Sequence, residues 1–133
     1  MGAVVLDSSV VVSLLSTTDS LHQAAVLAVA QHEAAGHSLL MPAVGWAEVF
    51  TGAVRRGAEG VTALRAFRNL VVNEIVPVDE QIAEEAARMR AADLALRLPD
   101  ALVVATGLCR DAEAVLTGDR RLAKVDERVR VIG

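Results

Sequence analysis

Cysteine and aromatic residues are scarce in this chain. It contains one cysteine, Cys109, with no tyrosine, one tryptophan and two phenylalanines, so that aromatics make up 2% of the residues. A single cysteine excludes an intrachain disulfide and a cysteine-based zinc site. The shortage of aromatic rings argues against RNA-binding modules that stack bases on aromatic side chains. Alanine, valine and leucine must therefore fill most of the interior.

Basic residues are missing from the first part of the chain. All 13 lysines and arginines lie after position 54, and all are arginine except Lys124. The N-terminus has no basic region ahead of an apolar stretch, and no apolar run approaches the roughly 20 residues that span a bilayer. We therefore expect a cytoplasmic protein that does not contact a membrane. The net charge of −4 disfavours a nucleic-acid partner, although a bound divalent metal would reverse the sign locally.

The order of the predicted elements indicates the fold class. With 133 residues, 53% of them hydrophobic, we expect a single domain over residues 1–133. The expected strands are 3–6, 38–41, 74–78, 114–116 and 129–132. The expected helices are 10–15, 21–35, 43–57, 60–70, 80–96, 99–110 and 119–125. Strands that alternate with helices predict an α/β sandwich with a mostly parallel sheet of about five strands.

Local signals set several of these boundaries. Ser8 and Ser9 offer N-cap hydroxyls for the first helix, and Gly36 ends the second. Pro77 indicates that the third strand lies at an edge of the sheet, because proline cannot donate to a strand ladder. The long helix that follows residue 79 carries apolar positions at helical spacing as far as Leu96.

Three aspartates fall where the predicted elements would bring them to one edge of the sheet. Asp7 directly follows the first strand, and Asp119 lies three residues past Leu116 at the end of the fourth. Asp100 lies in the first turn of the helix that begins at Pro99. Ligands of parallel sheets bind beyond the carboxyl ends of the strands, so this edge is where we expect chemistry.

A glutamate joins these aspartates. Glu48 shares a helical stripe with Val44, Ala47, Thr51 and Val54, so we expect it to face inward or to lie at a seam. A glutamate on an apolar stripe costs free energy unless it is paired. Each acid also has a simpler explanation, since an aspartate can cap a helix or complement its dipole, and the glutamate can belong to a buried salt bridge.

Taken together, the four carboxylates favour a metal site. Unpaired carboxylates in one pocket repel one another and titrate as a coupled set with raised pKa values, and a divalent cation removes that conflict. Ligands that are all oxygen select Mg²⁺ or Mn²⁺ over zinc. Such a site suits phosphodiester hydrolysis, because the metal can activate a water and neutralise charge that develops on the phosphate. The hydroxyls of Ser8, Ser9 and Thr117 can orient the carboxylates, or they can be ordinary cap and strand residues.

Four short motifs surround these acids: Val5-Leu6-Asp7-Ser8-Ser9, Ala47-Glu48-Val49, Leu98-Pro99-Asp100-Ala101-Leu102 and Leu116-Thr117-Gly118-Asp119. In this order and at this spacing they resemble the motifs of PIN-domain nucleases, most closely VapC-type toxins of bacterial toxin–antitoxin pairs. The resemblance covers the whole chain. It implies a PIN-like, three-layer α/β/α sandwich.

The resemblance also implies an activity. It implies an endoribonuclease that requires Mg²⁺ or Mn²⁺ and cleaves structured RNA, often tRNA or a ribosomal RNA loop. By carry-over, Asp7 and Asp100 would be the main metal ligands, with Glu48 and Asp119 completing the site directly or through water. The family pattern further implies a homodimer that a cognate VapB-type antitoxin holds inactive.

Basic residues that follow Glu48 or Asp119 along the chain are candidate contacts to RNA phosphates. They are Arg55, Arg56, Arg120, Arg121 and Lys124. The alternative is that they belong to solvated helix faces. On the helix of Glu48, a second apolar set that includes Trp46 and Phe50 indicates core packing or a surface covered by another chain.

Two other function classes are compatible with parts of the pattern. A phosphatase of the haloacid-dehalogenase type also places an aspartate after its first strand, but it needs a second aspartate where Ser9 stands. It also needs a suitably placed lysine, and Lys124 is the only lysine here. The alternative that stays open is a non-catalytic PIN-like module that binds RNA or a protein. Intact acids at all four positions count against it.

Overall fold

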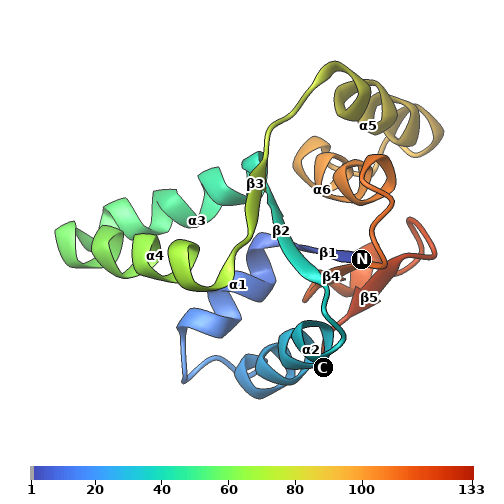
Figure 1. The fold of residues 1–133 in the computed structure, drawn as a ribbon. Helices are drawn as coiled ribbons and strands as arrows, with labels where there is room; N and C mark the ends of the chain where they lie inside the picture. Colours follow the sequence, from blue (N-terminus) through green and yellow to red (C-terminus); the bar gives the residue numbers. More distant parts are fainter. Residues whose placement is uncertain (1) are drawn as a thin grey trace.

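The strands form one parallel sheet at the centre of the structure, a computed structural model that describes residues 2–133 (Figure 1). The strands are β1 (Ala3–Leu6), β2 (Ser38–Pro42), β3 (Glu74–Val76), β4 (Ala114–Thr117) and β5 (Val129–Val131). Their order is β3-β2-β1-β4-β5, and every neighbouring pair is parallel. The predicted α/β class and five-stranded sheet are confirmed, with β1 at the centre.

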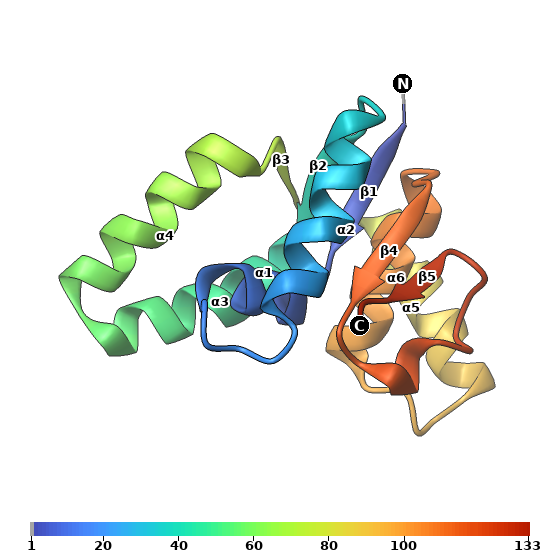
Figure 2. The ribbon, with the colours of Figure 1, turned by 90° about the horizontal axis from the view of Figure 1, so that it is seen from below.

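Helices cover both faces of this sheet, which confirms the predicted three layers (Figures 1 and 2). They are α1 (Ser8–Leu15), α2 (His22–Ala34), α3 (Ala43–Arg56), α4 (Ala58–Val71), α5 (Glu80–Ala92), α6 (Leu98–Cys109) and the 3₁₀ turn η1 (Arg120–Leu122). Helices α1 and α2 pack on one face, and α5 and α6 pack on the other. Within residues 2–133, none of the helices is long and apolar enough to cross a membrane.

The central strand serves both layers at once. Val4 and Leu6 belong to the apolar cluster under α1 and α2, whereas Val5 belongs to the cluster under α5 and α6. All three side chains are fully buried. Successive side chains of a strand point to opposite faces, so a strand with helices on both sides must be apolar without interruption. This requirement explains why the predicted first strand shows no polar alternation.

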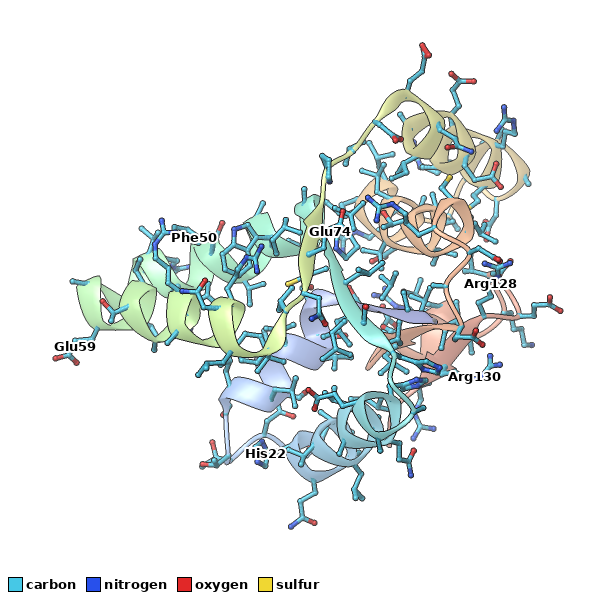
Figure 3. The ribbon with its side chains drawn as sticks, viewed as in Figure 1. His22, Phe50, Glu59, Glu74, Arg128 and Arg130 are labelled. Carbon is cyan, nitrogen blue, oxygen red and sulfur yellow. The ribbon has the colours of Figure 1, made fainter. Side chains whose placement is uncertain are left out.

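Helices α3 and α4 form a hairpin that extends away from the sheet (Figure 2). They approach closely where Gly60 lies against Ala53, since a Cβ at position 60 would be 2.7 Å from the Ala53 carbonyl oxygen. Phe50 of α3, which is labelled in Figure 3, packs against Trp46, with ring centroids 5.7 Å apart, and its ring centroid lies 5.2 Å from the Arg65 guanidinium of α4. The aromatic set of α3 is therefore half-buried between the two helices.

The edge strand β3 is held by an ion pair as well as by its neighbour. The carboxylate of Glu74, which is labelled in Figure 3, accepts two hydrogen bonds from the Arg110 guanidinium, at 2.9 and 2.7 Å. This contact joins the start of β3 to the residue that follows α6. The predicted edge position is confirmed, but the strand ends at Val76 and not at residue 78, because Pro77 cannot continue the ladder.

Three further predicted boundaries are wrong. The cap of α1 is Asp7, whose side chain accepts from the Ser8 backbone N–H, and not a serine hydroxyl. Helix α5 ends at Ala92 because Asp93 is extended, with φ of −146°, so Leu96 lies in the following turn. The helix predicted over residues 119–125 is only the short turn η1. In each case a polar side chain that bonds to nearby backbone ended or started the element.

A pair of glycine substitutions tests the packing of α6 on the sheet. A Cβ at Gly107 would lie 2.4 Å from Cγ2 of buried Val115, whose branched side chain has little room to move. Gly107→Ala should therefore destabilise the protein by about 1–3 kcal/mol. Gly52→Ala, where the nearest atom is 3.8 Å away, should stabilise α3 by about 0.5–1 kcal/mol. Urea denaturation of both variants measures the difference, and an unchanged midpoint for Gly107→Ala would contradict the packing.

Candidate active site

The four predicted acids lie in four separate parts of the chain. Asp7 lies between β1 and α1, and Asp119 lies between β4 and η1. Because β1 and β4 are neighbours in the sheet, these two residues lie at the same carboxyl edge. Asp100 is in the first turn of α6, and Glu48 is in the middle of α3.

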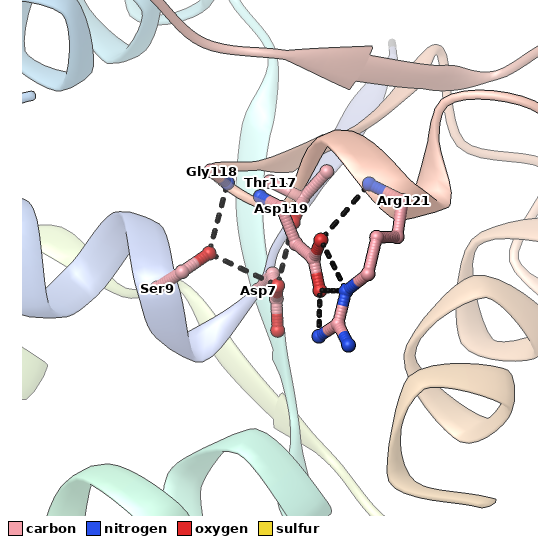
Figure 4. A network of polar contacts seen from close by, with 6 residues as sticks. All are labelled: Asp7, Ser9, Thr117, Gly118, Asp119 and Arg121. Atoms are coloured by element: carbon pink, nitrogen blue, oxygen red, sulfur yellow. Dashed lines mark hydrogen bonds and ion pairs between the residues drawn. The ribbon is translucent and has the colours of Figure 1, made fainter. Parts of the chain in front are cut away.

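Asp7 is buried but has no basic partner. Only 6% of its surface is exposed. Its Oδ1 accepts from the Ser8 N–H at 2.8 Å, and its Oδ2 accepts from the Ser9 hydroxyl at 3.0 Å and the Thr117 hydroxyl at 2.7 Å (Figure 4). In the part of the chain that the structure describes, no ion pair joins Asp7 to a basic side chain. Its hydrogen-bonding capacity is met by neutral groups, which leave its negative charge uncompensated.

The hydroxyls around Asp7 tie the two strand ends together. Thr117 donates to Asp7 and accepts from the Asp119 N–H at 3.0 Å. Ser9 donates to Asp7 and accepts from the Gly118 N–H at 2.9 Å (Figure 4). The hydroxyls of Ser9 and Thr117, each of which donates one hydrogen bond and accepts another, thus fix the loop after β4 to the start of α1.

Glu48 does not face inward, which was the first of the two positions predicted for it. The buried positions of α3 are Gly45, Val49 and Ala53, and Glu48 lies on the exposed side. The inward-facing stripe inferred from the sequence is wrong, because α3 turns the small residues of its other side toward the core. The Glu48 carboxylate nevertheless reaches the site, where its Oε1 accepts a long hydrogen bond of 3.4 Å from the Ser8 hydroxyl.

Charge repulsion links three of the acids. Partial burial, followed by the negative charge of Asp7, raises the pKa of Glu48. The same two causes, in the same order, raise the pKa of Asp100. Both carboxyl groups therefore lose stability as anions at this edge, in the manner expected of acids that share a pocket without a cation.

Asp119 differs from the other acids because it has a counterion. Its Oδ1 accepts from the backbone N–H and Nε of Arg121 at 2.9 and 3.0 Å, and its Oδ2 accepts from Nη2 at 2.7 Å (Figure 4). The hydrogen bonds and charge of Arg121 lower the pKa of Asp119. The prediction of four unpaired carboxylates is therefore wrong for this residue, since its partner lies two positions away on η1.

The donor set suits a hard divalent cation. All the candidate ligands are carboxylate oxygens, and the buried one carries a charge that no basic side chain offsets. Across residues 2–133, however, no three acidic, histidine or cysteine side chains converge closely enough to enclose an ion as they stand.

The basic residues are divided between two places. Arg120 and Arg121 follow Asp119 directly, and Lys124 lies in the turn that follows η1. Arg55 and Arg56 end α3 at the outer tip of the α3–α4 hairpin (Figure 2). The structure does not bring the two groups together on one rim.

The sequence reasoning missed Arg97. This residue precedes α6 as its N-cap, and its positive charge favours the ionised form of three of the acids: it helps to lower the pKa of one and partly opposes the rise in the pKa values of the other two. Those acids are Glu48, Asp100 and Asp119. Its position three residues before Asp100 was the available signal, since both residues then lie in or next to the same first helical turn.

With its parallel sheet and the acids at the carboxyl edge of that sheet, this chain is an α/β protein with a candidate metal site. The match to a family narrows that class, because the model of the PIN domain matches residues 4–128. The chain belongs to the PIN domain family. The predicted resemblance is confirmed at this level.

Solved structures share the fold. A toxin–antitoxin complex from Klebsiella pneumoniae is 22% identical, with a TM-score of 0.78 over 97% of each chain. VapBC2 from Rickettsia felis, bound to a promoter DNA fragment, is 11% identical, with a TM-score of 0.81 over 98% of this chain and 99% of that one. VapC20 of Mycobacterium tuberculosis, described as a sarcin-ricin loop cleaving toxin, is 20% identical, with a TM-score of 0.69 over 98% and 100%. No curated protein matches the chain in sequence.

Two threonine substitutions test how strongly the edge depends on hydroxyls. Thr117→Val keeps the shape of the side chain but removes the donor to Asp7 and the acceptor of the Asp119 N–H. We expect it to cost about 1–3 kcal/mol of unfolding free energy, because buried polar groups lose partners. Thr51→Val, which removes an exposed hydroxyl bonded to its own helix, should change stability by less than about 0.5 kcal/mol. Equal effects of the two changes in chemical denaturation would contradict this account.

Proposed function

We propose that this chain is a metal-dependent endoribonuclease and the toxin of a type II toxin–antitoxin pair. The observation that carries the proposal is the buried, uncompensated Asp7 carboxylate at the carboxyl edge of the sheet, whose charge acts on Glu48 and Asp100. Membership of the PIN domain family supports it. Carboxylates arranged in this way are costly in a protein without a cation and useful in one that binds Mg²⁺ or Mn²⁺.

In this proposal Asp7 and Asp100 are the main ligands of the ion, and Glu48 and Asp119 complete the site directly or through water. When bound, the ion would polarise a phosphate oxygen and activate a water for attack on phosphorus. Ser9 and Thr117 hold the Asp7 carboxylate in a fixed orientation through its Oδ2. A ligand that is already oriented loses less entropy when it binds, which favours the productive geometry.

The other acids have different tasks. Ser8 steadies Glu48 from the start of α1, but the long contact of 3.4 Å leaves that side chain free to adjust. Arg121 holds Asp119 at the rim by a two-point ion pair. Asp7 is thus the fixed point of the site, and the exposed acids adapt to what binds there.

The proposed substrate is structured RNA, either tRNA or ribosomal RNA, and the place of action is the cytoplasm. VapC20, a structural neighbour, is described as cleaving the sarcin-ricin loop, and that description supports an RNA substrate for this chain. Arg120, Arg121 and Lys124 are the proposed phosphate contacts beside the acids. Arg55 and Arg56 would contact phosphates farther along a large RNA.

The proposed partners are a VapB-type antitoxin and a second copy of the chain. Several structural neighbours were solved as toxin–antitoxin complexes, including VapBC-1 from nontypeable Haemophilus influenzae and VapBC from Salmonella typhimurium. An antitoxin would hold the nuclease inactive, and a homodimer would place two sites in one particle. We propose that residues 1–133 act as one domain in that assembly.

Cleavage of total RNA tests the proposed activity. Purified, antitoxin-free protein should make discrete cuts with Mg²⁺ or Mn²⁺ and none with EDTA, and sequencing of the new ends identifies the substrate. Asp7→Asn should slow cleavage by at least roughly a hundredfold. Replacing a residue that only orients a metal ligand already costs roughly 10- to 100-fold in activity, and replacing the ligand itself should cost more.

The matched control is Asp111→Asn. Asp111 lies beyond the opposite end of α6 and is largely exposed, and its positive φ of 50° suits asparagine as well as aspartate. This variant should cleave like the wild type. Metal binding without cleavage by any preparation would favour the non-catalytic PIN-like module over the nuclease.

A further inference from the structure

Next to Asp100 lies a cavity of about 190 Å³ between the turn that follows α5, the start of α6 and η1. Two arginines, Arg97 and Arg121, line it together with Asp100. Its apolar wall includes Leu96 and Leu122, which are almost fully buried. The cavity therefore combines an apolar wall with two cations next to a candidate metal ligand.

Arg97 is the arginine of this cavity whose charge is free. In the region that the structure describes, its guanidinium makes no ion pair or hydrogen bond, whereas Arg121 is engaged with Asp119. Its charge still acts on Glu48, Asp100 and Asp119. An exposed guanidinium this close to carboxylates, but bonded to none of them, can bind a phosphate in two-point geometry without first losing a partner.

A cation here works against a metal site on its own. Positive charge near the carboxylates weakens the attraction of a divalent cation to them. The same charge strengthens the binding of a polyanion that lies across the edge. Arg97 is thus a liability for metal binding alone and an advantage when the ligand is a nucleic-acid strand.

We propose that this cavity is a nucleotide subsite, in which Arg97 binds the phosphate of an RNA residue next to the cleaved bond and the leucine wall contacts its sugar or base. This subsite rests on the proposed nuclease function and adds the place where the RNA next to the cleaved bond is held. Asp93, whose Oδ1 accepts from the Ala95 N–H in the same wall, offers its remaining oxygen to a sugar hydroxyl or a base amino group.

RNA binding and Mn²⁺ binding measured on the same variants test the subsite. The probe is a short, labelled single-stranded RNA of mixed sequence, titrated in Ca²⁺ over a range of salt concentrations. Arg97→Gln should weaken binding about tenfold at low salt, as expected for loss of a charge-assisted contact. The slope of log affinity against log salt should become less steep by about 0.7, the value for one phosphate contact on a single strand. Arg97→Lys should keep most of that slope.

The same Arg97→Gln change should raise Mn²⁺ affinity in the absence of RNA, by roughly threefold, because a repelling charge is removed. If Arg97 only stabilised the fold, its replacement would not weaken RNA binding and strengthen Mn²⁺ binding at the same time. The control is Arg88→Gln, an equal charge change at an exposed residue of α5 paired with Glu84 and Glu85. It should leave the Mn²⁺ affinity and the salt slope unchanged.

The outcomes separate the subsite from the function on which it rests. If Arg97→Gln matches Arg88→Gln in RNA affinity and salt slope while the wild type binds Mn²⁺ and cleaves RNA, the subsite is overturned and the nuclease stands. If the wild type binds no Mn²⁺, the proposed function fails. If it binds Mn²⁺ but not the single-stranded probe, the subsite is overturned, and the cleavage assay on total RNA decides the nuclease.

Discussion

The carboxylate of Asp7 is the constraint on which the site depends. It is buried at the end of the central strand, where two hydroxyls and one amide satisfy its oxygens but no basic side chain offsets its charge. A buried charge in this state is tolerated only if its hydrogen bonds are complete and something nearby compensates for it. The position cannot move, because β1 is paired on both sides and packed on both faces.

The neighbouring charges follow from that constraint. Glu48 and Asp100 are pushed toward their neutral forms by partial burial and by the charge of Asp7, whereas Asp119 is kept charged by Arg121. The edge thus contains both repelling acids and nearby arginines, a mixture that suits a ligand with both signs of charge. A divalent cation together with a phosphodiester strand is such a ligand.

The sequence predicted the layers and the location of the site from two simple features. Uninterrupted apolar runs such as Val4-Val5-Leu6 required helices on both faces, and acids directly after such runs had to lie at the carboxyl edge. It could not predict which face of α3 is buried, because Glu48 and Val49 each lie on an apolar stripe and only the tertiary packing decides between them. Nor could it predict the Asp119–Arg121 pair, since a side chain two residues away can point either toward or away from the acid. Arg97 was missed because its effect comes from position in space and not from a motif.

The most direct test of the central claim is the position of a bound metal. A crystal structure of the protein with Mn²⁺, located by its anomalous scattering, should show the ion at the carboxyl edge of the sheet, coordinated by Asp7 and Asp100. Glu48 should have moved toward the ion, directly or through water. An ion bound away from Asp7, or a crystal structure in Mn²⁺ with no ion at this edge, would contradict the account.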